Sequence, residues 1–116
     1  MADWREFPKG VLMRPGEEIL RAERFGKRRL IYWLTTKRLI VGQQVRRGTQ
    51  AALTLPLDQC AAMAIETRKR FLHKETWIVI RSTGGVAIED EVSGGDGDRL
   101  SEFCGLVSNT IAGPMA

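Results

Sequence analysis

The apolar residues of this chain change their spacing once, and this change constrains the fold more than any other feature. As far as residue 90 they lie in short runs of β-branched and aromatic residues, separated by glycine, proline and charged residues, which is typical of strands. After residue 98 they recur on one face of a helix, at Leu100, Phe103, Cys104, Val107 and Ile111. The sequence therefore predicts about seven short strands followed by one C-terminal helix over residues 98–112.

Turn-forming residues delimit the expected strands. Two prolines and two glycines indicate that residues 1–17 form an extended lead-in with a turn at Pro15-Gly16. The alanines between 61 and 64 would suit a helix, but the length of the segment and the neighbouring runs favour a strand. Residues 67–74 are expected to form a basic connection. The expected strands are 19–25, 30–35, 38–45, 51–55, 58–66, 76–81 and 86–90.

The helix also indicates how many domains to expect. Asp98 is placed to cap it and Gly113-Pro114 to end it. Its apolar stripe needs a sheet to cover it, so residues 1–116 are expected to form a single domain. A length of 116 residues, with 43% hydrophobic and 28% charged residues, fits one globular domain.

Charge is distributed unevenly along the chain. Residues 1–81 hold 17 Lys or Arg and 8 Asp or Glu, whereas residues 82–116 hold one Arg and six acidic residues. The acidic run at residues 89–91 ends a strand and is expected to be solvated. The net charge of +4 therefore predicts two unlike surfaces, which could pair between copies or face a membrane.

Few residues could carry out catalysis. His73 is the single histidine, so a site with two histidine ligands is excluded. Cys60 and Cys104 lie in apolar stretches, where packed and unreactive thiols are expected, although the sequence leaves open a dyad of either cysteine with His73. We expect no enzyme activity, no metal and no cofactor.

Cysteine usage and hydropathy predict the compartment. Two unpaired cysteines are typical of a reducing environment. No apolar segment has the length of a signal peptide or a membrane span. We expect a cytoplasmic protein that can touch a membrane peripherally without crossing it.

Basic residues cluster at the expected strand connections. With antiparallel neighbours, the turns at Gly26 and Gly48 leave the same end of the sheet and can form one anion site, while the Thr36-Lys37 turn lies opposite. The alternative is that these charges only solvate exposed faces. The candidate anion-binding or lipid-binding residues are Lys27, Arg28, Arg29, Arg46 and Arg47.

Two adjacent aromatic residues bear on nucleic-acid binding. Single-strand binders present exposed aromatic side chains among basic residues. Tyr32 and Trp33 lie in one expected strand, so they face opposite sides of the sheet. We expect one of them in the core and the other either exposed or covered by the helix. Because no nucleic-acid motif accompanies them, nucleic acid is not the favoured partner.

Three segments carry a resemblance to a known family: residues 12–20 (LMRPGEEIL), 30–41 (LIYWLTTKRLIV) and 55–60 (LPLDQC). They resemble the P-G-E-E opening, the L-T-x-x-R-L-I hairpin and the I-P-L-x-x-I strand of bacterial pleckstrin-homology-like domains, relatives in layout of eukaryotic pleckstrin-homology and GRAM domains. The resemblance implies a mainly β fold, in which about seven antiparallel strands form a bent sandwich or partial barrel closed by one C-terminal α-helix.

The same resemblance implies a function. Domains of this kind are generally non-catalytic recognition modules, and several bacterial relatives self-associate. We therefore expect an interaction module that contacts a protein partner or a second copy of itself, with an anionic membrane surface as a further partner. The alternative is a small β-barrel protein that binds nucleic acid.

Overall fold

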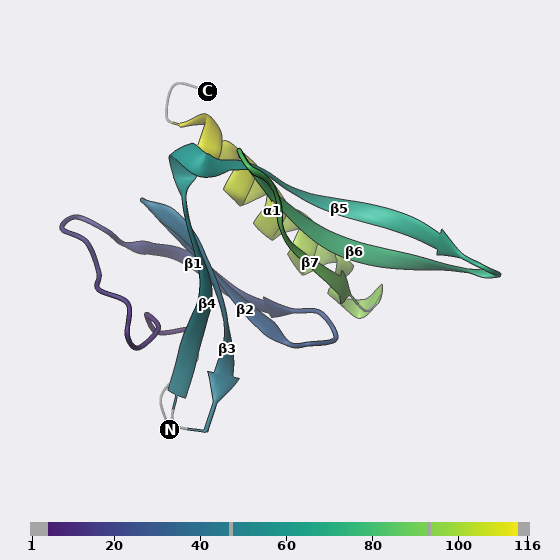
Figure 1. Ribbon diagram of the computed structural model, residues 1–116, viewed down its shortest axis with the longest axis horizontal. Coiled ribbons are helices and arrows are strands. Elements are labelled where there is room, and N and C mark those ends of the chain that lie inside the picture. The colour runs from purple at the N-terminus through teal and green to yellow at the C-terminus, as the bar shows by residue number, and fades with distance from the viewer. Residues whose placement is uncertain (1–4, 47, 93, 114–116) are drawn as a thin grey trace.

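The computed structural model describes residues 5–46, 48–92 and 94–113, and these form seven strands and one α-helix (Figure 1). The strands are β1 (Ile19–Phe25), β2 (Leu30–Thr35), β3 (Arg38–Val45), β4 (Gly48–Pro56), β5 (Cys60–Arg70), β6 (His73–Ser82) and β7 (Gly85–Val92). One antiparallel sheet has the order β1-β2-β3-β4 and the other the order β5-β6-β7. The predicted fold class, mainly β with a C-terminal helix, is confirmed.

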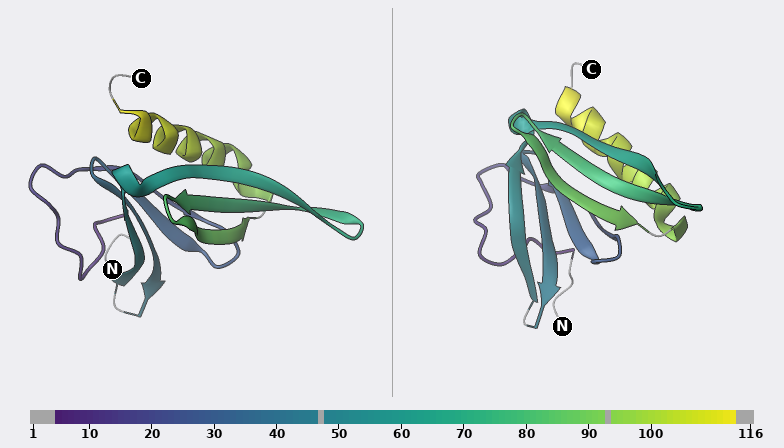
Figure 2. Two further views of the ribbon diagram at one scale, coloured as in Figure 1. Left: turned by 45° about the horizontal axis from the view of Figure 1, so that its top comes forward. Right: turned by 45° about the vertical axis from the view of Figure 1, so that its right-hand side comes forward.

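The helix α1 (Gly97–Ala112) closes the core that the two sheets share (Figure 2). The predicted apolar face is confirmed, because Leu100, Phe103, Cys104 and Val107 are buried and Ile111 packs against the same cluster. The Phe103 ring lies 5.9 Å from Phe25 and 6.3 Å from Tyr32, at angles close to edge-on, which aromatic pairs favour. Residues from β1, β2 and α1 thus meet in one core.

The ends of α1 differ in part from the expectation. Asp96 occupies the N-cap position, and Asp98 lies inside the first turn, where its charge suits the helix dipole. Gly113 ends the helix with φ 81, and its amide donates to the carbonyls of Asn109 and Thr110. Residue 114, expected as part of the stop signal, lies outside the described residues.

Both faces of β2 are buried, which corrects the expectation for its two aromatic residues. Tyr32 lies in the core beneath α1, and Trp33 lies on the opposite face with Ile31 and Ile40. The lead-in covers Trp33, with Phe7 and Val11 packed against that second cluster. The Trp33 ring is therefore neither exposed nor covered by the helix, because the N-terminal segment covers it.

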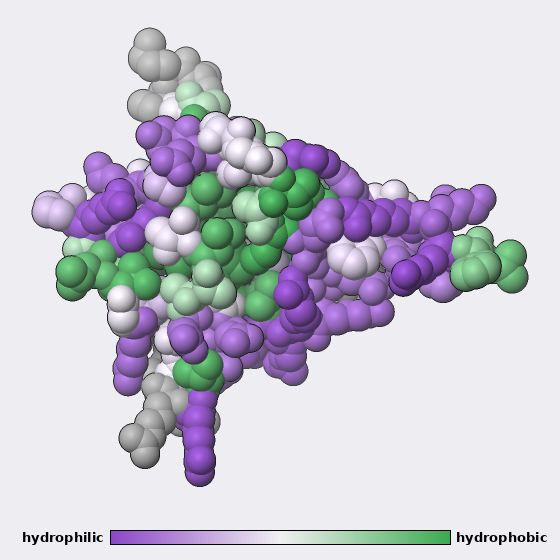
Figure 3. Space-filling model, viewed as in Figure 1, coloured by the Kyte–Doolittle hydropathy of each residue, from purple (hydrophilic) through white to green (hydrophobic). Residues whose placement is uncertain are grey.

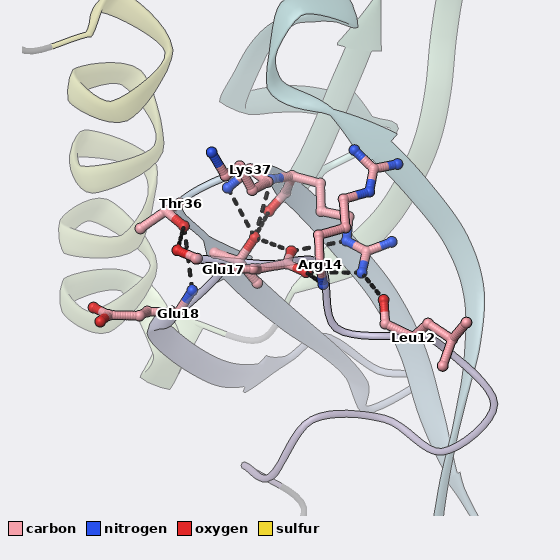
Figure 4. A network of polar contacts seen from close by, with 9 residues as sticks. Leu12, Arg14, Glu17, Glu18, Thr36 and Lys37 are labelled. Atoms are coloured by element: carbon pink, nitrogen blue, oxygen red, sulfur yellow. Dashed lines mark hydrogen bonds and ion pairs between the residues drawn. The ribbon is translucent and has the colours of Figure 1, made fainter.

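A buried ion pair fixes the lead-in to the first sheet (Figure 4). Arg38 donates to both carboxylate oxygens of Glu17, at 2.8 and 2.9 Å, and the Thr35 hydroxyl donates to Glu17 at 2.6 Å. Arg38 also donates to the Leu12 carbonyl at 2.6 Å, and the Arg14 amide donates to Glu17 at 2.9 Å. The P-G-E-E and L-T-x-x-R-L-I motifs therefore meet in space as one structural contact.

Three expected boundaries differ from the structure. Residues 67–74, expected as a basic connection, are mostly strand, because β5 continues to Arg70 and β6 begins at His73. Asp58 and Gln59, expected in a strand, lie in the 3₁₀ turn η1 (Leu57–Gln59) that joins the two sheets. The third boundary is in the first sheet, where β4 begins at residue 48 and not at 51.

Candidate functional site

The β1–β2 turn, residues 26–29, carries three of the five expected anion-binding residues and is docked on β7. The Lys27 amide donates to the Glu91 carbonyl at 2.9 Å, and Lys27 Nζ lies 2.9 Å from Glu91 Oε2. Arg28 Nε donates to Asp90 Oδ1 at 3.0 Å. Lys27 and Arg28 thus have carboxylate partners in their own chain, which reduces the positive charge that they offer to a ligand.

Asp90 is the buried acid of this contact, with a side chain that is 2% exposed. The expectation that the whole acidic run 89–91 is solvated is therefore wrong at its middle residue. Asp90 lies against Gly26, where φ is 90 and any Cβ would collide with the carboxylate. Only glycine fits this close approach between the turn and β7.

Arg29 is the third cation of the turn and differs from its neighbours. Its φ of 56 lies in the left-handed region that non-glycine residues rarely adopt. Its guanidinium makes no hydrogen bond or ion pair with the described part of the chain. Two open hollows, of about 350 and 300 Å³, adjoin it, and Arg24 lines both. Within the turn, Arg29 is therefore the cation that remains available to a ligand.

The two hollows differ in charge. The larger is lined also by Phe25, Gly26, Asp96 and Arg99, so it contains a carboxylate. The smaller is lined also by Arg28, Gln43 and Gln44, with no acidic side chain among its described lining residues. Arg24 Nη1 donates to Gln44 Oε1 at 3.0 Å, which orients the arginine along the rim. The smaller hollow is chemically the better place for an anion.

Arg99 is a residue of this region that the sequence did not single out. It extends from the first turn of α1, where Nη1 donates to Glu23 at 3.2 Å and Nη2 to Asp96 at 2.8 Å. Its guanidinium carbon also lies 5.2 Å from the centroid of the Phe25 ring, within cation–π range. The only sequence signal was a lone basic residue in the first turn of a helix, where acidic residues are usual.

The remaining candidates, Arg46 and Arg47, belong to the β3–β4 turn. Arg46 is exposed but does not line either hollow, and Arg47 lies outside the described residues. The twist of the sheet directs the β3–β4 turn away from the β1–β2 turn (Figure 1). The structure therefore groups Arg28 and Arg29 with Arg24, and does not bring Arg46 to them.

A second basic surface lies on the β5–β6 hairpin. Arg68 pairs with Glu89 at 2.7 Å and stacks over Trp77, with its guanidinium carbon 4.6 Å from the ring centroid. A further open hollow is lined by Arg68, Lys69, Arg70, Glu75 and Trp77. At the tip, Phe71 and Leu72 are 92% and 102% exposed. These cations were expected in a connection between strands, and no role was expected for the apolar pair.

Neither cysteine considered for catalysis is in a reactive environment, and Cys60 lies far from His73. Burial raises the pKa of both thiols, to about 11 for Cys104, so the nucleophilic thiolate is disfavoured. Cys60 pairs with Ser82 at one end of the β5–β6 ladder and His73 pairs with Arg70 at the other. Roughly 30 Å of strand separates them, because a strand rises about 3.3 Å per residue. This separation excludes a dyad between Cys60 and His73.

The described residues contain no group of three or more His, Cys, Asp or Glu side chains placed to hold a metal ion. Over the same residues, no helix combines the length and the apolar composition that crossing a bilayer requires.

The two bent sheets closed by one helix define a domain class. A scan against protein families finds no match, and no curated protein matches the sequence. Among solved structures, a pleckstrin homology domain from Shewanella amazonensis SB2B superposes with a TM-score of 0.58 at 16% identity. The match covers 83% of this chain and 87% of that one. The chain therefore has the pleckstrin-homology fold, as the sequence motifs predicted.

Proposed function

We propose that this chain is a non-catalytic recognition module that binds a phosphate-bearing group in the smaller hollow beside the β1–β2 turn. One observation carries the proposal: the Arg29 guanidinium, on a turn residue with positive φ, has no hydrogen-bond or ion-pair partner in the described part of the chain and lies next to a hollow whose described lining contains no carboxylate. An unpaired guanidinium beside other donors suits the oxygens of a phosphate group.

The other side chains of the hollow support the same chemistry. Arg24 and Arg28, the latter paired with Asp90, add guanidinium donors, and the side-chain amides of Gln43 and Gln44 add donors that carry no charge. The hollow is open and about 300 Å³ in volume, which suits a single headgroup or phosphate held at the surface. Because the site is exposed, its affinity should fall as salt is added.

The phosphate could belong to a lipid or be free in solution, and the test separates these sources. Chemical shifts of the ¹⁵N-labelled protein would be followed during addition of inorganic phosphate, and binding to phosphatidylglycerol vesicles would be measured by sedimentation. We expect shifts centred on residues 24–29 and 43–44 in the first arm. Vesicle binding alone, without those shifts, would assign the ligand chemistry to lipid.

The matched variants are Arg29→Glu and Lys37→Glu. Both residues are exposed cations without a side-chain partner in the described part of the chain, but Lys37 lies in the β2–β3 turn at the opposite end of β2. Arg29→Glu should weaken binding by ~10-fold or more, because it places a carboxylate at the rim, whereas Lys37→Glu should change it little. Equal losses of affinity in both variants would show that binding depends on net charge alone, and would contradict a site at Arg29.

Nucleic acid is the less favoured partner. Tyr32 and Trp33 are both fully buried, so neither offers a face for base stacking. A protein partner with acidic side chains, or a second copy of the chain, would use the same cations. For such a partner, inorganic phosphate would cause no chemical-shift changes at residues 24–29 and 43–44.

A further inference from the structure

The tip of the β5–β6 hairpin carries the two most exposed large apolar side chains of the described residues. Phe71 is 92% exposed and Leu72 is 102% exposed. They form the connection of a hairpin whose last pair is Arg70 with His73. Figure 3 shows this apolar tip at the end of a hydrophilic projection, at one extreme of the longest axis. Isolated exposed apolar residues are ordinary, but an adjacent pair at the most projecting point is not.

The backbone makes the tip more unusual. Phe71 has φ 53, in the left-handed region that turns of this length require and that glycine or asparagine normally occupies. A bulky aromatic residue is costly in that conformation. Both the backbone and the hydration of this residue are therefore unfavourable in the isolated protein. Strain of this kind is commonly retained where it serves a binding function.

The hairpin holds the tip clear of the rest of the molecule. The last pair between β6 and β7 joins Thr76 to Val92. Beyond it, β5 and β6 continue as a two-stranded ribbon through three more pairs, which extends roughly 10 Å at about 3.4 Å per pair. Figure 2 shows the same projection in both views. The tip is thus a convex, narrow element and not the wall of a groove.

Cations surround the base of the tip on both faces of the ribbon. Lys69 and Lys74 are directly opposite each other and share one face, although like charges at paired positions destabilise a ladder. Neither ammonium group pairs with the described part of the chain. Arg70 is on the other face, 3.7 Å from Glu75, with a side chain that is 69% exposed. An apolar tip with cations around its base is complementary to a partner that has an apolar interior beneath an anionic surface.

We infer that the β5–β6 tip inserts into the interface of a bilayer that contains anionic lipids. Phe71 and Leu72 enter the boundary between headgroups and acyl chains, while Lys69, Arg70 and Lys74 stay at the level of the lipid phosphates. A protein partner would need a pocket shaped for this convex point, whereas a bilayer accepts it without one. The site is separate from the hollow beside Arg29, so the inference goes beyond the proposed function.

The first test is sedimentation with vesicles of mixed phosphatidylglycerol and phosphatidylcholine. The variant Phe71→Ser/Leu72→Ser keeps every charge and should lower the partition coefficient by ~10-fold or more, since two apolar side chains no longer leave water. The matched control is Leu12→Ser, because Leu12 is 88% exposed in the lead-in on the side of the molecule away from the tip (Figure 1). Unchanged binding by the double variant, or an equal loss in the control, would overturn the inference.

The second test reports insertion itself and does not depend on sedimentation. The signal is the difference between the emission of Phe71→Trp and that of the wild-type protein, which removes the contribution of the three native tryptophans. This difference should shift to shorter wavelength when these vesicles are added, and brominated acyl chains should quench it. Vesicles of phosphatidylcholine alone should give a much smaller shift, because the cations then have no anionic partner. A difference spectrum that stays that of an exposed tryptophan with anionic vesicles would overturn the inference.

The two proposals fail separately. A silent phosphate titration, together with an inserted tip and vesicle binding that Arg29→Glu leaves unchanged, would reject the hollow beside Arg29 and keep the hairpin anchor. Chemical-shift changes with phosphate, together with a tip that stays exposed to solvent, would keep the hollow beside Arg29 and reject the hairpin anchor.

Discussion

The buried side chain of Glu17 shows what the P-G-E-E motif does in the structure. Its carboxylate is buried, which by itself would raise its pKa, but hydrogen bonds from Arg38, the Arg14 amide and Thr35 hold the pKa at about 2. The pair joins the lead-in to the β2–β3 hairpin and thereby keeps the cover over Trp33 in place. The P-G-E-E and L-T-x-x-R-L-I motifs are therefore joined by a contact that stabilises the fold.

This pKa predicts a pH dependence of stability. A carboxyl group with a lowered folded pKa stabilises the protein above its unfolded value of 4.5, and this contribution disappears as the pH falls toward 2. Glu17→Gln should lower the free energy of unfolding at pH 7 by about 3 kcal/mol, because it leaves Arg38 buried without a charge partner. Urea denaturation at pH 7 and pH 3 measures both effects.

The control for this prediction is the exposed neighbour Glu18. Glu18→Gln should change stability by less than about 0.5 kcal/mol and keep the wild-type pH dependence. In Glu17→Gln, the loss of stability between pH 4.5 and 2 should be smaller than in the wild-type protein. A variant with the wild-type pH slope would show that Glu17 is not the titrating group.

At the scale of elements, the docking of the β1–β2 turn on β7 depends on one glycine. Gly26→Ala should lower the free energy of unfolding by about 2 kcal/mol or more, because the left-handed backbone disfavours alanine and its Cβ would displace Asp90. Gly16→Ala is the matched control, since Gly16 has φ 75 and nothing near the added atom. Urea denaturation of both variants isolates the collision. Equal losses would mean that the contact with Asp90 is unimportant.

The elements that were predicted correctly are those that local periodicity determines. The helix face and the first three strands repeat at the spacing of their own secondary structure, so the sequence alone places them. The β5–β6 ribbon was missed because solvent reaches both of its faces, and no alternation of apolar and polar residues marks such a strand. A weaker signal existed in the apolar pair at residues 71–72, flanked on both sides by basic residues.

The candidate site was predicted less completely, because its geometry depends on contacts between distant residues. Arg28 and Asp90 are 62 positions apart, and their pairing removes one cation from the expected set. Arg99 enters the region only because α1 begins beside β1. Arg29 was predicted, but its isolation from partners follows from the conformation of the turn. Such features require the tertiary structure.

In the whole molecule, acidic and basic segments that are far apart in the sequence lie next to each other. The acidic residues of β7 meet the basic β1–β2 turn within one chain, and Arg68 pairs with Glu89 in the same region. These charges are therefore already satisfied and offer less to a second copy than the sequence suggested. Among the cations without a side-chain partner in the described part of the chain, Arg29 belongs to the β1–β2 turn, and Lys69 and Lys74 belong to the β5–β6 hairpin. Both elements extend toward the right-hand side of Figure 1.

The central claim is that this end of the molecule is its recognition surface. Hydrogen–deuterium exchange, with and without phosphatidylglycerol vesicles, tests it most directly because it surveys every turn at once. We expect protection of amides at residues 26–29 and 69–74, and unchanged exchange at residues 12–16 and 36–37 on the other side. Protection confined to the lead-in or to the β2–β3 turn, or none anywhere, would contradict the account.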